Sequence, residues 1–302
     1  GDRWGRALKD LSPLKGLQVK HLNLGRKHGI QSLSPLAGMK LESLWLSGSK
    51  VTDLSPLNGM PLKELGINFY MDMYSPSCNV SDLSPLRGMK LKKLRLEKTK
   101  VTSIAALEGM PLEELLLTDS PISDLTPLRN MKTLKILSIS GTKVTSLEAL
   151  SGLDLDRLYF SRTKVSDLKP LKNMRLSSIQ GDQTLVSSIA PLRGDRLTSI
   201  SLQSTGLSNI EPIRNMPHLN HFYFADTKVK DLSPLIARPK MYKLSIPDPK
   251  QVSGLEAIRS LKSLYHMSIE PWAGYRSNRM TPVDFWNLMA DPTYKPSYHD
   301  RD

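Results

Sequence analysis

The sequence predicts an α/β solenoid, a right-handed coil of about twelve short repeats that share one parallel β-sheet. Twelve copies of the phrase Leu-x-x-Leu-x-Leu run through the 302 residues, and successive copies begin 21 to 23 residues apart, except for one interval of 29. A constant period in the low twenties with this phrase is typical of a leucine-rich repeat, whose units stack on one another. The copies begin at Val19, Leu41, Leu62, Leu91, Leu112, Leu134, Leu155, Leu176, Leu197, Leu219, Met241 and Leu264.

The first part of each repeat is predicted to be a short strand. In the repeat that begins at Leu41, the leucines Leu44 and Leu46 alternate with other residues. This period of two places them on one buried face of a strand. We number positions from the first leucine of the phrase. Positions 1, 4 and 6 are then expected to point into the core, and positions 3, 5, 7 and 8 to face outward on the inner, concave side of the sheet.

The second part of each repeat is predicted to be a short extended or 3₁₀ segment on the convex side. A Ser or Thr follows the strand, an apolar residue comes two later, and Asp-Leu-Ser-Pro-Leu or a close variant follows, as at residues 49–57. Proline lacks an N–H and fixes φ, and few residues remain, so a long helix is excluded. The hydroxyl is expected to bond backbone groups where the chain turns away from the sheet.

This unit resembles the internalin-type leucine-rich repeat of bacterial proteins, whose phrase matches Val51-Thr52-Asp53-Leu54-Ser55-Pro56-Leu57 and its copies over roughly residues 11–270. Most repeats here are one residue shorter, with Gly59-Met60-Pro61-Leu62 as an example. These short units and the closing segment 281–286 also look like repeats appended to bacterial serine/threonine protein kinases. The first resemblance implies the fold and a binding role. The second implies the sensory or docking part of a larger receptor-like kinase, although no kinase motif occurs in this chain.

Three segments are expected along the chain. Residues 1–18 are predicted to form an N-terminal cap helix and a first partial repeat, because Trp4, Ala7, Leu8 and Leu11 recur at helical spacing. Residues 19–270 form the solenoid. Residues 271–302 are predicted to hold a C-terminal cap helix and a tail, since Thr281, Pro282 and Asp284 fit an N-cap, an N1 proline and a first-turn acid.

The interval of 29 arises from an insertion at residues 70–77, just after the third strand. Its aromatic and methionine side chains are typical of interfaces, so we expect a rim loop that helps to hold a partner. An idle loop folded onto the flank is the alternative. These side chains are Tyr70, Met71, Met73 and Tyr74. Cys78 falls at the Ser/Thr position and is expected to be a buried structural thiol.

The net charge of +13 raises the question of nucleic acid or an anionic surface as a partner. The outward positions of the strands carry seven basic and eight acidic residues, a net charge of −1, so the excess lies elsewhere. It lies in two sets that are expected to stack along outer edges and to be solvated. The first set is Lys50, Lys100, Lys143, Lys164 and Lys228; the second is Lys15, Arg87, Arg129, Lys172, Arg193 and Arg214.

Large side chains at outward strand positions are the candidate binding residues, since exposed aromatic groups on a rigid sheet are typical of interface hot spots. Scattered surface residues without a partner are the alternative. The candidates are Trp45, Phe69, Lys93, Arg95, Arg157, Tyr159, Arg162, His221, Tyr223 and His266.

The sequence contains no motif that points to an enzyme. It has no Gly-rich phosphate loop, nucleophile elbow or His-Glu-x-x-His, and its six histidines have no partner at ligand spacing. We therefore expect no catalytic residue, cofactor or metal. No stretch approaches the roughly 20 apolar residues of a membrane span. One cysteine excludes an internal disulfide and is compatible with the cytoplasm, while an extracytoplasmic location stays open. The polar start at Gly1, without Met, indicates a trimmed chain from which targeting signals can have been removed.

The sequence thus predicts a monomeric module that holds a protein or peptide on the concave sheet, with the rim loop beside it. A polyanion or surface binder that uses the basic edges is the alternative, and a spacer without a partner is a third. Nucleic acid is the less favoured partner, because the charge lies off the concave face.

Overall fold

The computed structural model describes residues 10–24, 29–46, 49–68, 78–192, 194–269, 280–291 and 293. The chain divides into two compact units, an N-terminal unit of residues 1–155 and a C-terminal unit of residues 156–302. Throughout the described residues the twelve strands follow one another in the sheet in sequence order. Each repeat therefore adds one strand beside the strand of the preceding repeat, which confirms the predicted solenoid.

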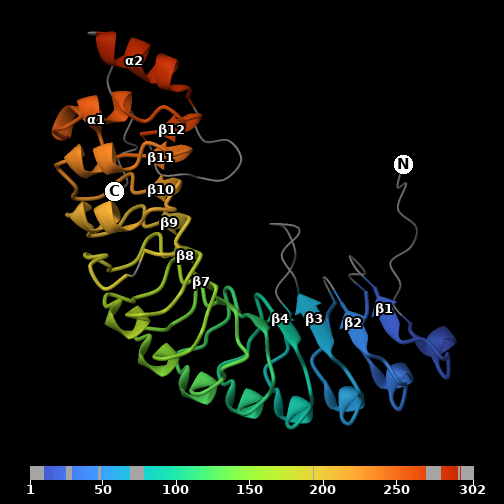
Figure 1. Ribbon diagram of the computed structural model, residues 1–302. Coiled ribbons are helices and arrows are strands. Elements are labelled where there is room, and N and C mark those ends of the chain that lie inside the picture. The colour runs from blue at the N-terminus through green and yellow to red at the C-terminus, as the bar shows by residue number, and fades with distance from the viewer. Residues whose placement is uncertain are drawn as a thin grey trace, which may run out of the picture. The chain divides into compact units, whose positions relative to one another are not determined.

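The N-terminal unit contains six strands that begin two residues after the first leucine of each phrase. Neighbouring strands pair in parallel with equivalent positions opposite one another, as in Leu44 opposite Leu65. The strands are β1 (His21–Asn23), β2 (Ser43–Trp45), β3 (Glu64–Asn68), β4 (Lys93–Leu96), β5 (Glu114–Leu116) and β6 (Ile136–Ser138). In Figure 1 they run from the blue end of the chain into green.

A 3₁₀ turn returns the chain in each repeat of this unit. In most of them the residue two before the turn is Asp, whose carboxylate accepts a hydrogen bond from the first turn amide; Asp53 Oδ1 lies 2.7 Å from Ser55 N. The Asp53 carboxylate also accepts from the Ser55 hydroxyl, so its role is to fix the start of the turn. The turns are η1 (Ser12–Leu14), η2 (Ser34–Leu36), η3 (Ser55–Leu57), η4 (Ser84–Leu86), η5 (Ala105–Leu107), η6 (Thr126–Leu128) and η7 (Glu148–Leu150).

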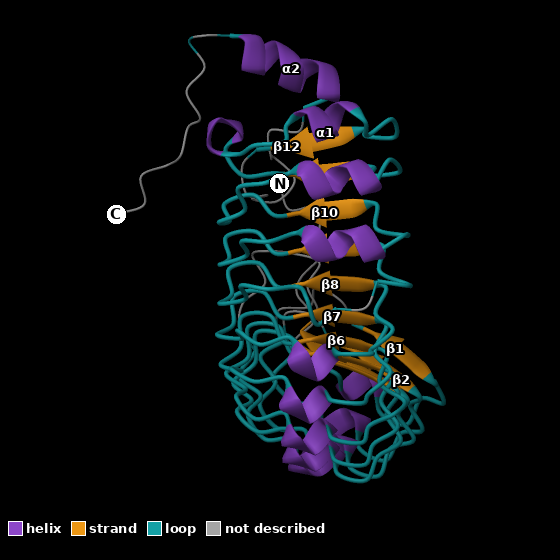
Figure 2. Ribbon diagram, turned by 60° about the vertical axis from the view of Figure 1, so that its left-hand side comes forward, coloured by secondary structure: helices purple, strands orange, loops and turns teal. Residues whose placement is uncertain are grey.

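The C-terminal unit repeats this plan with longer returns near its end. Figure 2 shows its strands lying one above another, and Figure 1 shows the short helices on the opposite side of the repeats. The strands are β7 (Arg157–Tyr159), β8 (Ser178–Gln180), β9 (Ser199–Ser201), β10 (His221–Tyr223), β11 (Lys243–Ser245) and β12 (His266–Ser268). The helices are η8 (Lys169–Leu171), η9 (Glu211–Asn215), η10 (Ser233–Ala237), η11 (Pro249–Gln251), α1 (Glu256–Arg259) and α2 (Pro282–Ala290).

The core lies between the strands and the return segments. The side chains at positions 4 and 6 are buried along almost the whole series, and Phe160, Phe222 and Phe224 are among the largest. The hydroxyl after the strand bonds the carbonyl three residues earlier, as predicted; Thr163 Oγ1 donates to Phe160 O at 2.7 Å. Cys78 takes the same place. Its thiol is buried and lies 3.4 Å from Val51 O, and burial raises the pKa of the thiol.

The last described helix closes the C-terminal unit. Thr281 and Asp284 form a reciprocal capping box at the start of α2. Phe285 is completely buried and α2 contacts β12.

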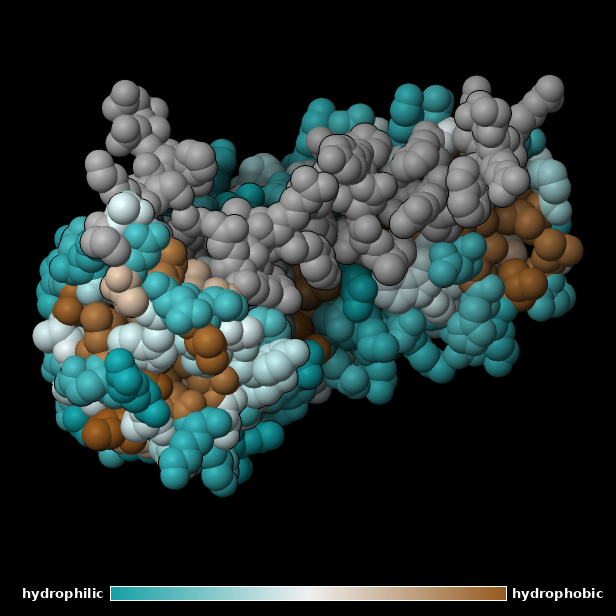
Figure 3. All heavy atoms as spheres, turned by 90° about the horizontal axis from the view of Figure 1, so that it is seen from above, coloured by the Kyte–Doolittle hydropathy of each residue, from teal (hydrophilic) through white to brown (hydrophobic). Residues whose placement is uncertain are grey.

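At the other end of the chain, the first repeat exposes Leu17 and Val19. Figure 3 shows apolar side chains at the surface of this end, on the right-hand side. The predicted cap residues Trp4, Ala7 and Leu8 lie outside the described residues, as does the 70–77 insertion.

Candidate functional site

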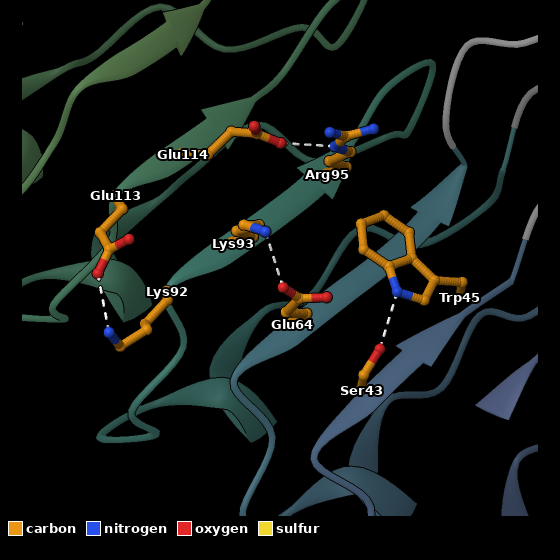
Figure 4. Close-up of polar contacts among 8 residues, drawn as sticks. All are labelled: Ser43, Trp45, Glu64, Lys92, Lys93, Arg95, Glu113 and Glu114. Atoms are coloured by element: carbon orange, nitrogen blue, oxygen red, sulfur yellow. Dashed lines mark hydrogen bonds and ion pairs between the residues drawn. The ribbon is translucent and has the colours of Figure 1, made fainter. Parts of the chain in front are cut away.

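Several contacts hold the Trp45 side chain on the outward strand face of the N-terminal unit. Its indole Nε1 donates to Ser43 Oγ at 2.8 Å. Its ring lies directly against Gly66, which is opposite it in β3; a Cβ added to Gly66 would be 2.3 Å from Trp45 Cε3. The Arg95 guanidinium lies 5.2 Å from the ring centroid; Arg95 is on β4 and Trp45 on β2, with β3 between them (Figure 4). The half-buried ring is therefore pre-positioned across three strands.

The charged side chains beside Trp45 are paired with one another. Arg95 Nε lies 2.6 Å from Glu114 Oε1, and Lys93 Nζ lies 2.8 Å from Glu64 Oε1. The hydrogen bond to Glu64 raises the pKa of Lys93. The structure thus brings the predicted residues Trp45, Lys93 and Arg95 together, and acids of adjacent strands fix the orientation of the two basic side chains (Figure 4).

The predicted residues of the C-terminal unit fall into two groups. Arg157, Tyr159 and Arg162 belong to the repeat of β7, where Tyr159 is half-buried and both arginines are exposed. His221 and Tyr223 lie on β10 with ring centroids 6.5 Å apart. His266 lies two strands further on, at the register position of His221.

A buried polar network runs along the strand face of this unit from β8 to β11. Asp182 Oδ1 accepts from Ser201 Oγ at 2.6 Å and from the Gln203 amide at 2.9 Å, and Oδ2 accepts from Gln180 Nε2 at 3.1 Å. Burial raises the pKa of Asp182. Gln203 Oε1 accepts in turn from Ser245 Oγ at 3.2 Å. Hydrogen bonds therefore already hold the side chains of this stretch in place, and the groups that donate them are uncharged hydroxyls and amides.

Two of the eight acids that the sequence predicts at outward positions are not exposed on that face. Glu97 and Asp248 are buried, with 6% and 8% of their surface exposed. Asp248 accepts from the Lys250 amide at 2.9 Å at the start of η11, because position 8 already belongs to the turn that leaves the sheet. Phe69, Tyr70, Met71, Met73 and Tyr74 lie outside the described residues.

Position 2 of each repeat, which the period-two pattern does not single out, forms a continuous row. We call it the strand-start row, because each residue directly precedes its strand. Its amides bond to the carbonyl of the preceding row member within each unit, as in Tyr265 N to Tyr242 O at 3.0 Å. In the N-terminal unit the row is Lys20, Glu42, Lys63, Lys92, Glu113 and Lys135; in the C-terminal unit it is Asp156, Ser177, Thr198, Asn220, Tyr242 and Tyr265.

The two halves of this row differ in chemistry. In the N-terminal unit its charges pair; Glu42 lies 2.9 Å from Lys20 Nζ and 2.6 Å from Lys63 Nζ. The hydrogen bond from Lys63 lowers the pKa of Glu42 to about 2. In the C-terminal unit the row ends in Tyr242 and Tyr265, which are exposed and stacked. Two aromatic residues 23 apart at position 2 were the sequence signal for this pair.

The side chains of the described residues assemble no metal site. Within these ranges, no group of three or more His, Cys, Asp or Glu side chains could hold a metal ion. None of the helices described there is long and apolar enough to cross a bilayer.

Comparison with known proteins places the fold. No protein-family model and no curated protein sequence matches the chain. Among solved structures it is similar to an internalin (InlF) from Listeria monocytogenes, with 21% identity, a TM-score of 0.64, and 83% of this chain and 81% of that chain covered. It is also similar to a leucine-rich-repeat protein of Leptospira interrogans, with 19% identity, a TM-score of 0.57, and 88% and 82% covered.

A third similar structure is the plant peptide hormone receptor RGFR1 in complex with RGF2, at 18% identity and a TM-score of 0.51, with 85% of this chain and 50% of that chain covered. The strands, the 3₁₀ returns and these neighbours together define a leucine-rich-repeat solenoid. More particularly, the fold is similar to that of an internalin, the resemblance that the Asp-Leu-Ser-Pro-Leu return predicted. At these identities the likeness is one of fold.

Proposed function

We propose that the chain is a binding module that holds a protein or peptide on its outward strand face. The observation that carries this proposal is the fixed, half-exposed Trp45, which Ser43, Gly66 and Arg95 hold in one orientation. An aromatic side chain that is already immobilised loses little entropy when a partner covers it. The similarity to a receptor solved in complex with RGF2 supports the same class of function.

The proposal extends to the 70–77 insertion, to the oligomeric state and to the larger protein. The 70–77 insertion comes soon after β3 in the sequence, the strand that carries Gly66 beneath Trp45, and its tyrosines and methionines are the further candidates for contact with the partner. The module would act as a monomer, and in a receptor-like kinase it would be the sensory or docking part.

Selection from a displayed library of random peptides tests the proposal without a known partner. Peptides enriched on the wild-type protein are labelled, and their affinity is measured by fluorescence anisotropy for wild type, Trp45→Ala and Tyr159→Ala. We expect a loss of about tenfold or more for at least one variant, because hot-spot aromatics dominate such interfaces. Ile236→Ala, which alters an exposed apolar side chain on η10, serves as the control. Enriched peptides that bind both strand-face variants as tightly as wild type would contradict the proposal.

A second candidate function is the binding of a polyanion along the basic outer edge. The five lysines after the turn hydroxyl are exposed, and within the described ranges none of them forms a salt bridge. The nearby aspartate Asp231 accepts instead from Ser233. Heparin affinity of wild type and of the triple variant Lys143→Glu, Lys164→Glu, Lys228→Glu separates the candidates. If the chain binds polyanions along this edge, wild type should bind heparin with a steep dependence on salt, and the triple variant should lose that binding. The strand-face proposal predicts no such loss.

A further inference from the structure

Four rings form a continuous row at the strand starts of β10, β11 and β12. Tyr242 and Tyr265 stack with centroids 5.4 Å apart and an interplanar angle of 11°. His221 lies edge-on at 5.8 Å from Tyr242, and His266 lies edge-on at 4.2 Å from Tyr265. The tyrosines are 41% and 56% exposed. The row therefore presents an aromatic surface that is rigid, because backbone hydrogen bonds at position 2 fix its spacing.

The chain segments that carry this ring row have charged residues of one sign only. The three strand-start segments 216–223, 238–245 and 259–266 contain no Asp or Glu, but five Lys and Arg residues. The two arginines have partners: Arg238 donates to backbone carbonyls, and Arg259 lies 4.2 Å from the Trp286 ring. The three lysines, Lys240, Lys243 and Lys262, form no salt bridge within the described part of the chain. This contrasts with the N-terminal unit, where acids of the same row pair with its lysines.

We infer that Tyr242 and Tyr265, flanked by Lys240, Lys243 and Lys262, bind an acidic polypeptide segment. The aromatic row supplies contact area at low entropy cost, and the lysines supply attraction for carboxylates. This inference rests on the proposed function and names the chemistry of its partner. It places the contact at the strand starts of the C-terminal unit, on residues that differ from Trp45 and Tyr159.

A polypeptide fits this surface better than a single-stranded nucleic acid. Binding of bases without sequence preference uses aromatic faces on which each base can stack. Here the tyrosines stack on each other, and each has a histidine ring against it as well.

The test uses a labelled random copolymer of glutamate and tyrosine as the acidic polypeptide probe, with a lysine–tyrosine copolymer and oligothymidylate for comparison. Affinity is measured for the whole chain by fluorescence anisotropy. The first variant is Tyr242→Thr with Tyr265→Thr, because Thr198 occupies the same row and donates its hydroxyl to Ser177 O at 3.0 Å. The second is Lys240→Gln with Lys262→Gln. The matched control is Lys100→Gln with Lys143→Gln, which removes the same charge from the N-terminal unit.

The expected result is that the glutamate–tyrosine copolymer binds and the lysine–tyrosine copolymer does not. The tyrosine variant should weaken binding about tenfold or more, as for a hot-spot aromatic pair. The Lys240/Lys262 variant should also weaken it, and the control should leave it unchanged. Equal binding by the tyrosine variant, an equal loss in the control, or tighter binding of oligothymidylate through the same tyrosines would overturn the inference. Selected peptides that need Trp45, together with a glutamate–tyrosine copolymer whose binding ignores both tyrosines, would leave the proposed function standing and overturn this inference alone.

Discussion

Two glycines that make room for a neighbouring aromatic ring should respond very differently to the same added methyl group. A Cβ at Gly181 would lie 2.3, 2.5 and 2.9 Å from three ring atoms of Phe160, which is completely buried. A Cβ at Gly66 would lie 2.3 Å from the ring of Trp45, which is half-exposed. Neither glycine has a left-handed backbone, so alanine adds no backbone strain.

The magnitude follows from where each ring can move. Phe160 has no exposed direction, so Gly181→Ala should cost close to the upper end of the roughly 1–3 kcal/mol of an overpacked core. The stiffer unfolded chain returns about 0.5 kcal/mol in either variant, which leaves a net loss of about 2.5 kcal/mol for Gly181→Ala. Trp45 can turn toward solvent, so Gly66→Ala loses mainly one neutral hydrogen bond and one cation–π contact, each of about 1 kcal/mol or less. Its net loss should be smaller by at least about 1 kcal/mol.

Urea denaturation followed by far-ultraviolet circular dichroism measures both effects, with hydrogen exchange of the Gly181 amide as a local readout. That amide donates to Ser201 O at 2.8 Å and should exchange faster in Gly181→Ala. The matched double variant Phe160→Leu with Gly181→Ala removes the clash, so the coupling between the two changes should be favourable by about 1 kcal/mol or more. Equal destabilisation by the two alanines, or no coupling, would refute the reasoning.

Four further outcomes are expected. Asp182→Asn should raise the urea midpoint at pH 7, because burial raises the pKa of Asp182 above its ordinary value of 3.8 and penalises the charged form; the gain should shrink as the pH falls through the folded-state pKa. Asp82→Asn, which places there the residue that Asn209 supplies at the same turn position, should lower the thermal midpoint at pH 7. Hydrogen bonds lower the pKa of Asp82, so this difference should vanish as the pH falls below 3.8 through the folded-state pKa. Phe285→Ala should cost about 3–5 kcal/mol at the C-terminal end, measured by hydrogen exchange of β12. The Cys78 thiol should react with a thiol reagent at pH 8 only after unfolding, and rapid native labelling would contradict its burial.

The fold was predictable because the same pattern of apolar residues recurs in twelve successive repeats. Positions 4 and 6 lie on the same face of a strand, so leucine at both indicates that this face is buried. The structure buries Leu44, Leu46 and their equivalents. The turn hydroxyl was predictable for the same reason, since its bond to the carbonyl three residues earlier is local; Thr142 and Thr184 show it at 2.6 Å.

The candidate site was predictable only in part. Position in the phrase correctly placed Trp45, Arg95 and Tyr159 at the surface of the strand face. It did not reveal that Arg95 binds Glu114, because side-chain pairing across strands depends on rotamers. Nor did it find the stacked Tyr242 and Tyr265, since position 2 precedes the strand and the alternation rule gives it no face.

By itself the sequence determined the period, the buried leucines and the outward positions, because these follow from the geometry of one repeat. Only the tertiary structure decided which outward groups meet. Parallel registration brings residues 21 to 29 apart in the N-terminal unit into contact, so Glu64 meets Lys93 and Gly66 receives the Trp45 ring. The physical reason is that these contacts form between repeats, through hydrogen-bonded strands and packed rings, and a single repeat contains only one of the two partners.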